Sequence, residues 1–214
     1  MRPTATRQDL LRRALTLEYA TIAWNVGEAV LTISLGSIAA SVALIGFGTV
    51  SIAEVFASSV VVWHVRKSDE DQAALTAIAL RLIAMAFLVL ASALIVAAVN
   101  DLVTGRRAGE SPWGIAYLAV TAVVMFTLAG LKRRTAGALG SEPLASEATI
   151  TFLDGILSVT TLTGLALNAY SGLWWADPVA GLLLGIAAIN EARETWKEAK
   201  VLATAGYQSV GTDR

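Results

Sequence analysis

Six apolar segments of about twenty residues each constrain the fold of this chain more than any other feature of its sequence. A helix needs about 20 mostly apolar residues to cross the hydrocarbon core of a bilayer. It also satisfies its own backbone hydrogen bonds, which lipid cannot do. We therefore predict an all-α membrane protein, a bundle of six transmembrane helices. The predicted spans are 19–39, 41–63, 80–99, 112–131, 149–169 and 174–191.

The positively charged residues predict how this bundle lies across the membrane, because Lys and Arg concentrate in cytoplasmic loops. If both termini are cytoplasmic, 13 of the 16 Lys and Arg residues lie inside, Lys132 and its neighbours Arg133 and Arg134 among them. Only Arg106 and Arg107 then lie outside. We therefore expect a multi-pass protein of the cell membrane with both termini cytoplasmic. Its predicted parts are an N-terminal anchor at 1–18, a six-helix transmembrane domain at 19–191 and a short tail at 192–214.

The composition excludes several other classes of protein. The chain has no cysteine and one histidine, which excludes disulfide scaffolds, thiolate zinc sites and multi-histidine sites within one chain. Its formal charge of −1 provides no basic surplus for nucleic acid. No nucleophile–base pair and no phosphate-binding loop stands out in the sequence, so we expect no enzyme and no organic cofactor.

Three carboxylates lie deep inside the predicted spans, away from the span ends, and a charge at the bilayer centre costs about 2.5–3.5 kcal/mol on insertion scales. They are Glu28, Glu54 and Asp154. Counting from the inner ends of their spans places the first two about 14 Å deep and the third about 8–11 Å deep. We expect no Lys or Arg at that depth. The acids therefore predict a shared site for a cation or for protons, the alternative being hydrogen-bonded carboxyls that hold the helices together.

The second and fifth spans carry the same short polar pattern. In each, a hydroxyl residue is followed by an acid three residues later and by a serine four residues after that. Repeated elements often flank a transporter's binding site near the midplane of the membrane, so we interpret this match as a weak internal repeat. The two sets are Ser51, Glu54 and Ser58, and Thr151, Asp154 and Ser158.

Several of these motifs resemble the cation diffusion facilitator family, also called the cation efflux family. Residues 18–28 resemble a short bacterial branch of the family that lacks its cytoplasmic domain. The resemblance implies a homodimer of six-helix protomers in the lipid bilayer that exports a divalent metal ion, usually zinc, in exchange for protons. The most specific motifs are WWADPVAG at 174–181, GFG at 46–48 with Ser51 and Glu54, and Asp154 with Ser158.

The resemblance also implies a metal site built from two pairs of acid or histidine ligands. Within each pair the ligands are four residues apart, and the pairs correspond here to Val50 with Glu54 and to Ile150 with Asp154. One member of each pair is apolar, so other oxygen ligands must take part if a metal binds. The predicted metal ligands are Glu54, Asp154, Glu28, Asn25, Ser51, Thr151 and Glu147.

An oxygen-rich ligand set suits hard ions such as Mn²⁺, Mg²⁺ or Ca²⁺, and zinc also accepts carboxylates. Zinc is the ion expected from the resemblance, with manganese or iron as further candidates. The apolar residues at Val50 and Ile150 leave an alternative open, a non-transporting scaffold, partner subunit or metal sensor derived from a transporter. Near the inner mouth, Glu18 and Glu147 could attract an entering cation or be ordinary helix-start acids. His64 is expected to be a solvated interfacial residue.

Overall fold

The computed structural model describes residues 6–38, 42–67, 72–105 and 112–211, which form six helices and no strand. The predicted all-helical, six-helix chain is confirmed. The helices are α1 (Arg7–Ile38), α2 (Val42–Arg66), α3 (Gln72–Thr104), α4 (Pro112–Leu139), α5 (Glu142–Ser171) and α6 (Ala176–Gly211).

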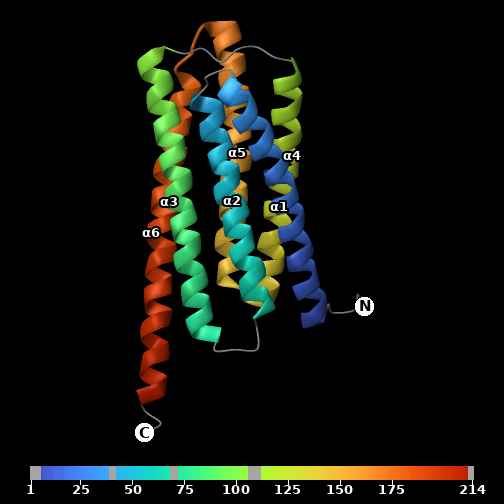
Figure 1. Cartoon of the computed structure of the whole chain (residues 1–214), viewed down its shortest axis with the longest axis vertical. Helices are drawn as coiled ribbons and strands as arrows, with labels where there is room; N and C mark the ends of the chain where they lie inside the picture. The colour runs from blue at the N-terminus through green and yellow to red at the C-terminus, as the bar shows by residue number, and fades with distance from the viewer. Residues whose placement is uncertain (1–5, 39–41, 68–71, 106–111, 212–214) are drawn as a thin grey trace.

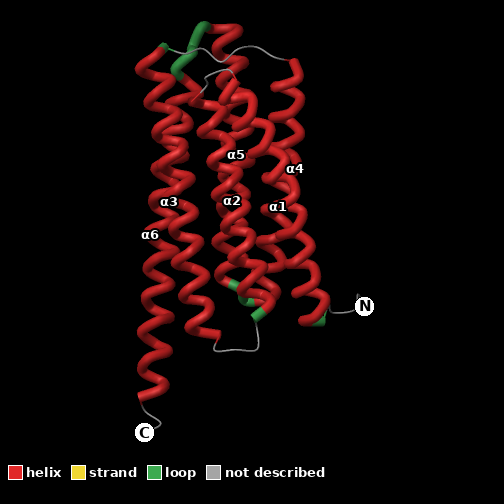
Figure 2. Tube along the Cα trace, viewed as in Figure 1, coloured by secondary structure: helices red, strands yellow, loops and turns green. Residues whose placement is uncertain are grey.

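The six helices stand side by side in one bundle, with successive helices antiparallel (Figure 1). Helices α2 and α5 are central, α3 and α6 pack together on one side, and α1 and α4 lie on the other. Short described loops join α4 to α5 and α5 to α6 (Figure 2). Helix α1 begins and α6 ends at the same end of the bundle, where the α4–α5 connection also lies. We call this the inner end, because the predicted orientation makes it cytoplasmic.

The helices extend beyond the predicted spans at the inner end. Helix α1 begins at Arg7, so most of the predicted anchor at 1–18 continues into the first span. Thr6 caps this helix: its hydroxyl accepts a hydrogen bond from the Asp9 amide at 3.2 Å, and its own amide donates to the Asp9 carboxylate at 3.1 Å. The hydrogen bonds from Thr6 hold the pKa of the Asp9 carboxyl below its ordinary value.

Helices α4 and α6 are also longer than predicted. Helix α4 continues to Leu139, eight residues past the predicted end of the fourth span, so Gly137, which lies between the fourth and fifth predicted spans, is helical. Helix α6 continues to Gly211, so most of the predicted tail at 192–214 is helical. The extension of α4 has the largest consequence for the site, because Lys132 lies within the helical bundle and not in a loop beyond it.

Three helical segments of the described chain are long and apolar enough to cross a membrane: Gly48–Arg66, Ala73–Thr104 and Ala116–Leu139. They belong to α2, α3 and α4. Helices α1 and α5 carry buried acids that lower their hydropathy, among them Glu28 and Asp154. By length and composition, these three helices could span a membrane, and the count of six spans stays a prediction.

The core is built largely from small and aliphatic side chains, and large apolar residues also cover the outside of the bundle. On α3, Ile83, Phe87 and Leu90 follow helical spacing and are buried toward the neighbouring helices. Val123 on α4 and Leu183 on α6 are more than 60% exposed. An apolar outer surface of this kind indicates contact with lipid.

Candidate functional site

A tight turn between α4 and α5 fixes the geometry of the inner half of the bundle. Gly140 adopts a left-handed conformation with φ of 64°, which ends α4. The Ser141 amide then donates to the Ala136 carbonyl at 3.1 Å, as in a Schellman C-cap. Because this connection is so short, α4 and α5 must run antiparallel in direct contact, as they do.

This turn places Lys132 opposite Glu147. Lys132 lies eight residues before Gly140 and Glu147 lies seven residues after it. At 1.5 Å per residue, both are therefore about 10–12 Å from the turn along their helices. The two side chains meet inside the bundle, and neither is exposed to solvent.

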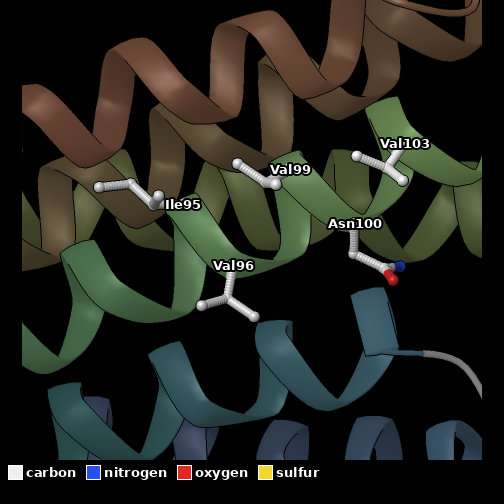
Figure 3. Close-up of a pocket in the computed structure, with 5 residues that line it drawn as sticks. All are labelled: Ile95, Val96, Val99, Asn100 and Val103. Carbon is white, nitrogen blue, oxygen red and sulfur yellow. The ribbon is translucent and has the colours of Figure 1, made fainter.

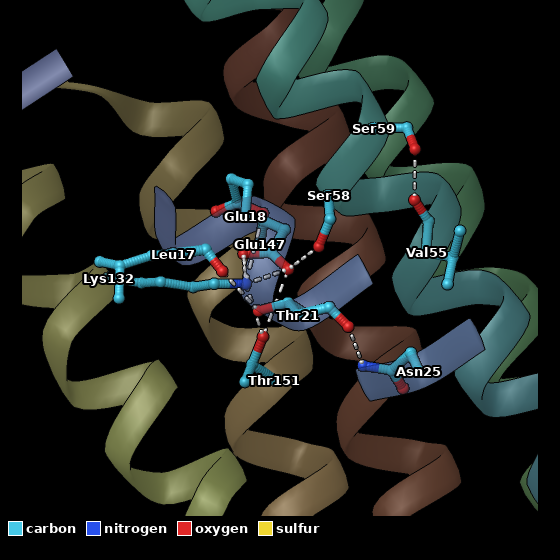
Figure 4. A network of polar contacts seen from close by, with 10 residues as sticks. All are labelled: Leu17, Glu18, Thr21, Asn25, Val55, Ser58, Ser59, Lys132, Glu147 and Thr151. Carbon is cyan, nitrogen blue, oxygen red and sulfur yellow. Dashed lines mark hydrogen bonds and ion pairs between the residues drawn. The ribbon is translucent and has the colours of Figure 1, made fainter. Parts of the chain in front are cut away.

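Lys132 is the centre of a buried polar group that Figure 4 shows, which we call the inner cluster: Glu18, Ser58, Lys132, Glu147 and Thr151. Its Nζ lies 2.7 Å from both carboxylate oxygens of Glu147 and 3.3 Å from Oε2 of Glu18. It also donates to the Thr151 hydroxyl at 3.2 Å, and the Ser58 hydroxyl donates to Glu147 at 2.8 Å. The cluster joins α1, α2, α4 and α5.

The inner cluster corrects two predictions. The sequence predicts Lys132 as a cytoplasmic surface charge, and it predicts no Lys or Arg at the depth of the acids. Instead the Lys132 side chain is fully buried, whereas the adjacent Arg133 and Arg134 are exposed. The reason is helical geometry: α4 continues past these residues, and position 132 faces the bundle interior while the next two face outward.

A second polar group lies further from the inner end, and we call it the outer cluster: the buried Glu28 and Ser51 and the half-buried Tyr117. The Ser51 hydroxyl donates to Glu28 Oε2 at 3.0 Å, and the Tyr117 hydroxyl donates to Glu28 Oε1 at 2.5 Å. Ten residues of α1 separate Glu28 from Glu18, or about 15 Å along the helix axis. Tyr117 was not among the predicted site residues, because an aromatic residue in an apolar span has no sequence signal of polar function.

Glu54 and Asp154 lie between these clusters on the two central helices. Glu54 is 0% exposed and Asp154 is 1% exposed. Their charges interact electrostatically with each other, and that of Glu54 also interacts with Lys132 and Glu28. Within the described part of the chain, none of their four carboxylate oxygens accepts a hydrogen bond. Buried carboxylates of this kind need a proton or a cation to balance their charge.

The remaining predicted residues have local roles. The Asn25 side-chain amide donates to the Thr21 carbonyl of its own helix at 3.1 Å (Figure 4). Val50 and Ile150 are 1% and 0% exposed and belong to the apolar core.

His64 is half-buried, and its Nε2 lies 3.0 Å from the Thr76 hydroxyl, so it is held between α2 and α3 rather than fully solvated.

The seven predicted ligands thus fall into separate groups. Ser51 pairs with Glu28 in the outer cluster, Thr151 pairs with Glu147 in the inner one, and Glu54 and Asp154 lie between. Among the described residues, no three Asp, Glu or His side chains lie close enough together to hold one metal ion.

One groove of the bundle is distinct from these clusters. It has a volume of about 460 Å³ and is lined by residues of α3 alone (Figure 3). Asn100 is the only polar residue among them, and the others are Ile95, Val96, Val99 and Val103. Because it contains no charged side chain, this groove does not compete with the buried carboxylates as a cation site.

Comparison with known proteins places this arrangement in a family. No curated protein matches the chain. Residues 19–202 match the cation efflux transmembrane domain, and this range covers most of the 214 residues and nearly all of both clusters. The resemblance noted in the sequence is thereby confirmed. The chain is a membrane protein that belongs to the cation efflux family, whose members transport metal ions.

Proposed function

We propose that this protein exports a divalent metal cation in exchange for protons, with Glu54 and Asp154 as the acids that hold the cation. The observation that carries this proposal is the pair of buried carboxylates on α2 and α5 that accept no hydrogen bond within the described residues. Family membership supports metal-ion transport in general, and the carboxylate pair supports a specific binding site for the transported ion.

The chemistry of this pair suits exchange between protons and a metal ion. Two carboxylates that share a desolvated space cannot both remain charged without compensation. Two protons or one divalent cation each neutralise the pair, so one species can replace the other at no net change of buried charge. Because a pair provides only two acidic ligands, we expect hydroxyl groups, water or a small movement of Glu28 to complete the coordination of the ion.

The ligands restrict which ions fit, and the family suggests one of them. The acidic and hydroxyl side chains near the pair can coordinate a metal only through oxygen atoms. Manganese, iron and zinc ions all bind oxygen ligands. Zinc remains the expected substrate because of the family. We further propose that the protein is a homodimer in the cell membrane and that it is not an enzyme.

Metal binding by the purified protein in detergent tests the proposal. Calorimetry with Zn²⁺, Mn²⁺, Fe²⁺, Mg²⁺ and Ca²⁺ should detect binding of at least one ion to the wild type. Glu54→Gln and Asp154→Asn should each lose that binding. Glu191→Gln, which neutralises an exposed acid of α6, should retain it. Binding that survives in both buried variants would show that the pair does not hold the ion.

A second candidate function has an observation in its favour. Val50 and Ile150 fill core positions where the family resemblance implies ligands, and their burial shows that they serve packing. A non-transporting scaffold or metal sensor would retain the bundle with this altered site. If no ion binds to the wild type, this candidate is preferred and the buried acids are packing groups.

A further inference from the structure

The Lys132 ammonium occupies a position that resembles a cation site. Oxygens of two carboxylates and one hydroxyl, from α1 and α5, lie 2.7–3.3 Å from its Nζ. Carboxylate and hydroxyl oxygens are also the groups that hard divalent cations bind. One ammonium faces two carboxyl groups, so when Glu18 and Glu147 are both ionised their charge exceeds that of Lys132 by one unit. A divalent cation in this position would neutralise both.

The Glu18 side chain provides a second observation, because it is paired less closely than Glu147. It is 0% exposed, and neither of its carboxylate oxygens accepts a hydrogen bond within the described residues. The one cation in that part of the chain that pairs with it is Lys132, at 3.3 Å, which is longer than the 2.7 Å contacts from Lys132 to Glu147. The ammonium therefore satisfies Glu147 well and Glu18 only in part.

We propose that Lys132 acts as a tethered cation. Its ammonium fills the position between Glu18 and Glu147 and so prevents a divalent cation from being retained there. This rests on the proposed function in one respect: a cation that moves from the inner end toward Glu54 passes the level of the inner cluster. The tether is what allows a single charge to compete, because a covalently held group has a high effective concentration at its site.

Replacing Lys132 should therefore create a metal site. The Lys132→Met variant keeps an unbranched side chain but removes the charge. We expect it to bind one more divalent ion per chain than the wild type, measured by elemental analysis after equilibrium dialysis against Mn²⁺. Lys132→Arg, which keeps a cation in place, should bind the same number of ions as the wild type. Equal numbers in Lys132→Met and the wild type would overturn the proposal.

Two further variants locate the additional ion. In a Glu54→Gln/Asp154→Asn background, Lys132→Met should still gain one ion, because neither residue of that pair is among the oxygens that contact the Lys132 Nζ. Adding Glu147→Gln to Lys132→Met should abolish the gain. A gain that persists without Glu147 would place the ion elsewhere and contradict the proposal. The result is independent of whether Glu54 and Asp154 bind metal, so failure here and failure of the proposed function can be distinguished.

The stability of the Lys132→Met variant provides a further test. Lys132→Met leaves two buried carboxylates without their cation, which is strongly destabilising. If the variant aggregates in metal-free buffer, Mn²⁺ present throughout purification should restore folded protein, because a ligand that binds only the native state stabilises it. Aggregation that Mn²⁺ does not reduce would also overturn the proposal.

Discussion

At the scale of single residues, Tyr117 and Glu28 show how the bundle accommodates a charge. Each Glu28 carboxylate oxygen accepts a hydrogen bond from a different helix, one from Ser51 on α2 and one from Tyr117 on α4. Hydrogen bonds to a charged group are worth more than bonds between neutral groups, and a buried acceptor that loses its donor incurs a desolvation penalty. Tyr117 is therefore expected to contribute to stability well beyond its aromatic packing.

We predict that Tyr117→Phe lowers the free energy of unfolding by about 1–3 kcal/mol, since it leaves a Glu28 oxygen without a donor. Tyr19→Phe is the matched control. Its hydroxyl also forms a hydrogen bond, to Arg66, but the residue is 44% exposed and water can replace the partner. The control should change stability by no more than about 0.5 kcal/mol. Equilibrium unfolding in detergent measures both, and equal effects would contradict this account of Tyr117.

The candidate residues differ in how far the sequence could identify them. Glu28, Glu54 and Asp154 could be identified because an acid within an apolar segment is costly and therefore conspicuous. Lys132 was missed because it begins a run of three basic residues, which is the usual sign of a span's cytoplasmic end. A signal did exist: Lys132 and Glu147 lie at similar distances on either side of Gly140, as partners in an antiparallel hairpin must.

At the scale of helices, small residues control how closely neighbours approach. Gly185 on α6 lies against Ile95 and the backbone of Ala91 on α3, and Gly181 lies against Ala98. The four-residue spacing of this glycine pair predicts a packing role, and the contacts confirm it. A Cβ at position 185 would lie 2.7 Å from Ile95 Cγ1, so any larger side chain must shift the Ile95 side chain or move the two helices apart.

We predict that Gly185→Leu destabilises the protein by about 1–3 kcal/mol through overpacking of the α3–α6 interface. Gly137→Ala is the control, because a Cβ added to this exposed glycine of α4 would have no neighbouring heavy atom within 4 Å. It should stabilise the protein by about 0.5–1 kcal/mol through higher helix propensity. Thermal unfolding in detergent distinguishes the two, and a Gly185→Leu variant as stable as the wild type would show that α3 and α6 are not closely packed.

The number of helices and their rough positions could be predicted because apolar length is a strong signal. Their inner ends could not, since α1, α4 and α6 continue as helix through charged residues that end an apolar span without ending the helix. Hydropathy reports where the chain meets lipid, whereas helix ends depend on local caps such as Gly140. That difference explains why Lys132 was predicted outside the bundle.

At the scale of the whole molecule, the basic residues predict that the inner end of the bundle is cytoplasmic. The chain has no cysteine, so single cysteines can be introduced as reporters. Thr104→Cys, at the exposed outer end of α3, should react with a membrane-impermeant maleimide on intact cells. Lys200→Cys, exposed on the inner part of α6, should react only after permeabilisation. The opposite pattern would reverse the orientation and the direction of transport that follows from it.

The central claim is that Glu54 and Asp154 together carry a metal cation across the membrane in exchange for protons. Zn²⁺ flux into sealed proteoliposomes under an imposed pH gradient tests it most directly. The account predicts flux that depends on the gradient in the wild type and in Glu191→Gln, and none in folded Glu54→Gln or Asp154→Asn. Wild-type flux in either of these buried-acid variants would contradict it.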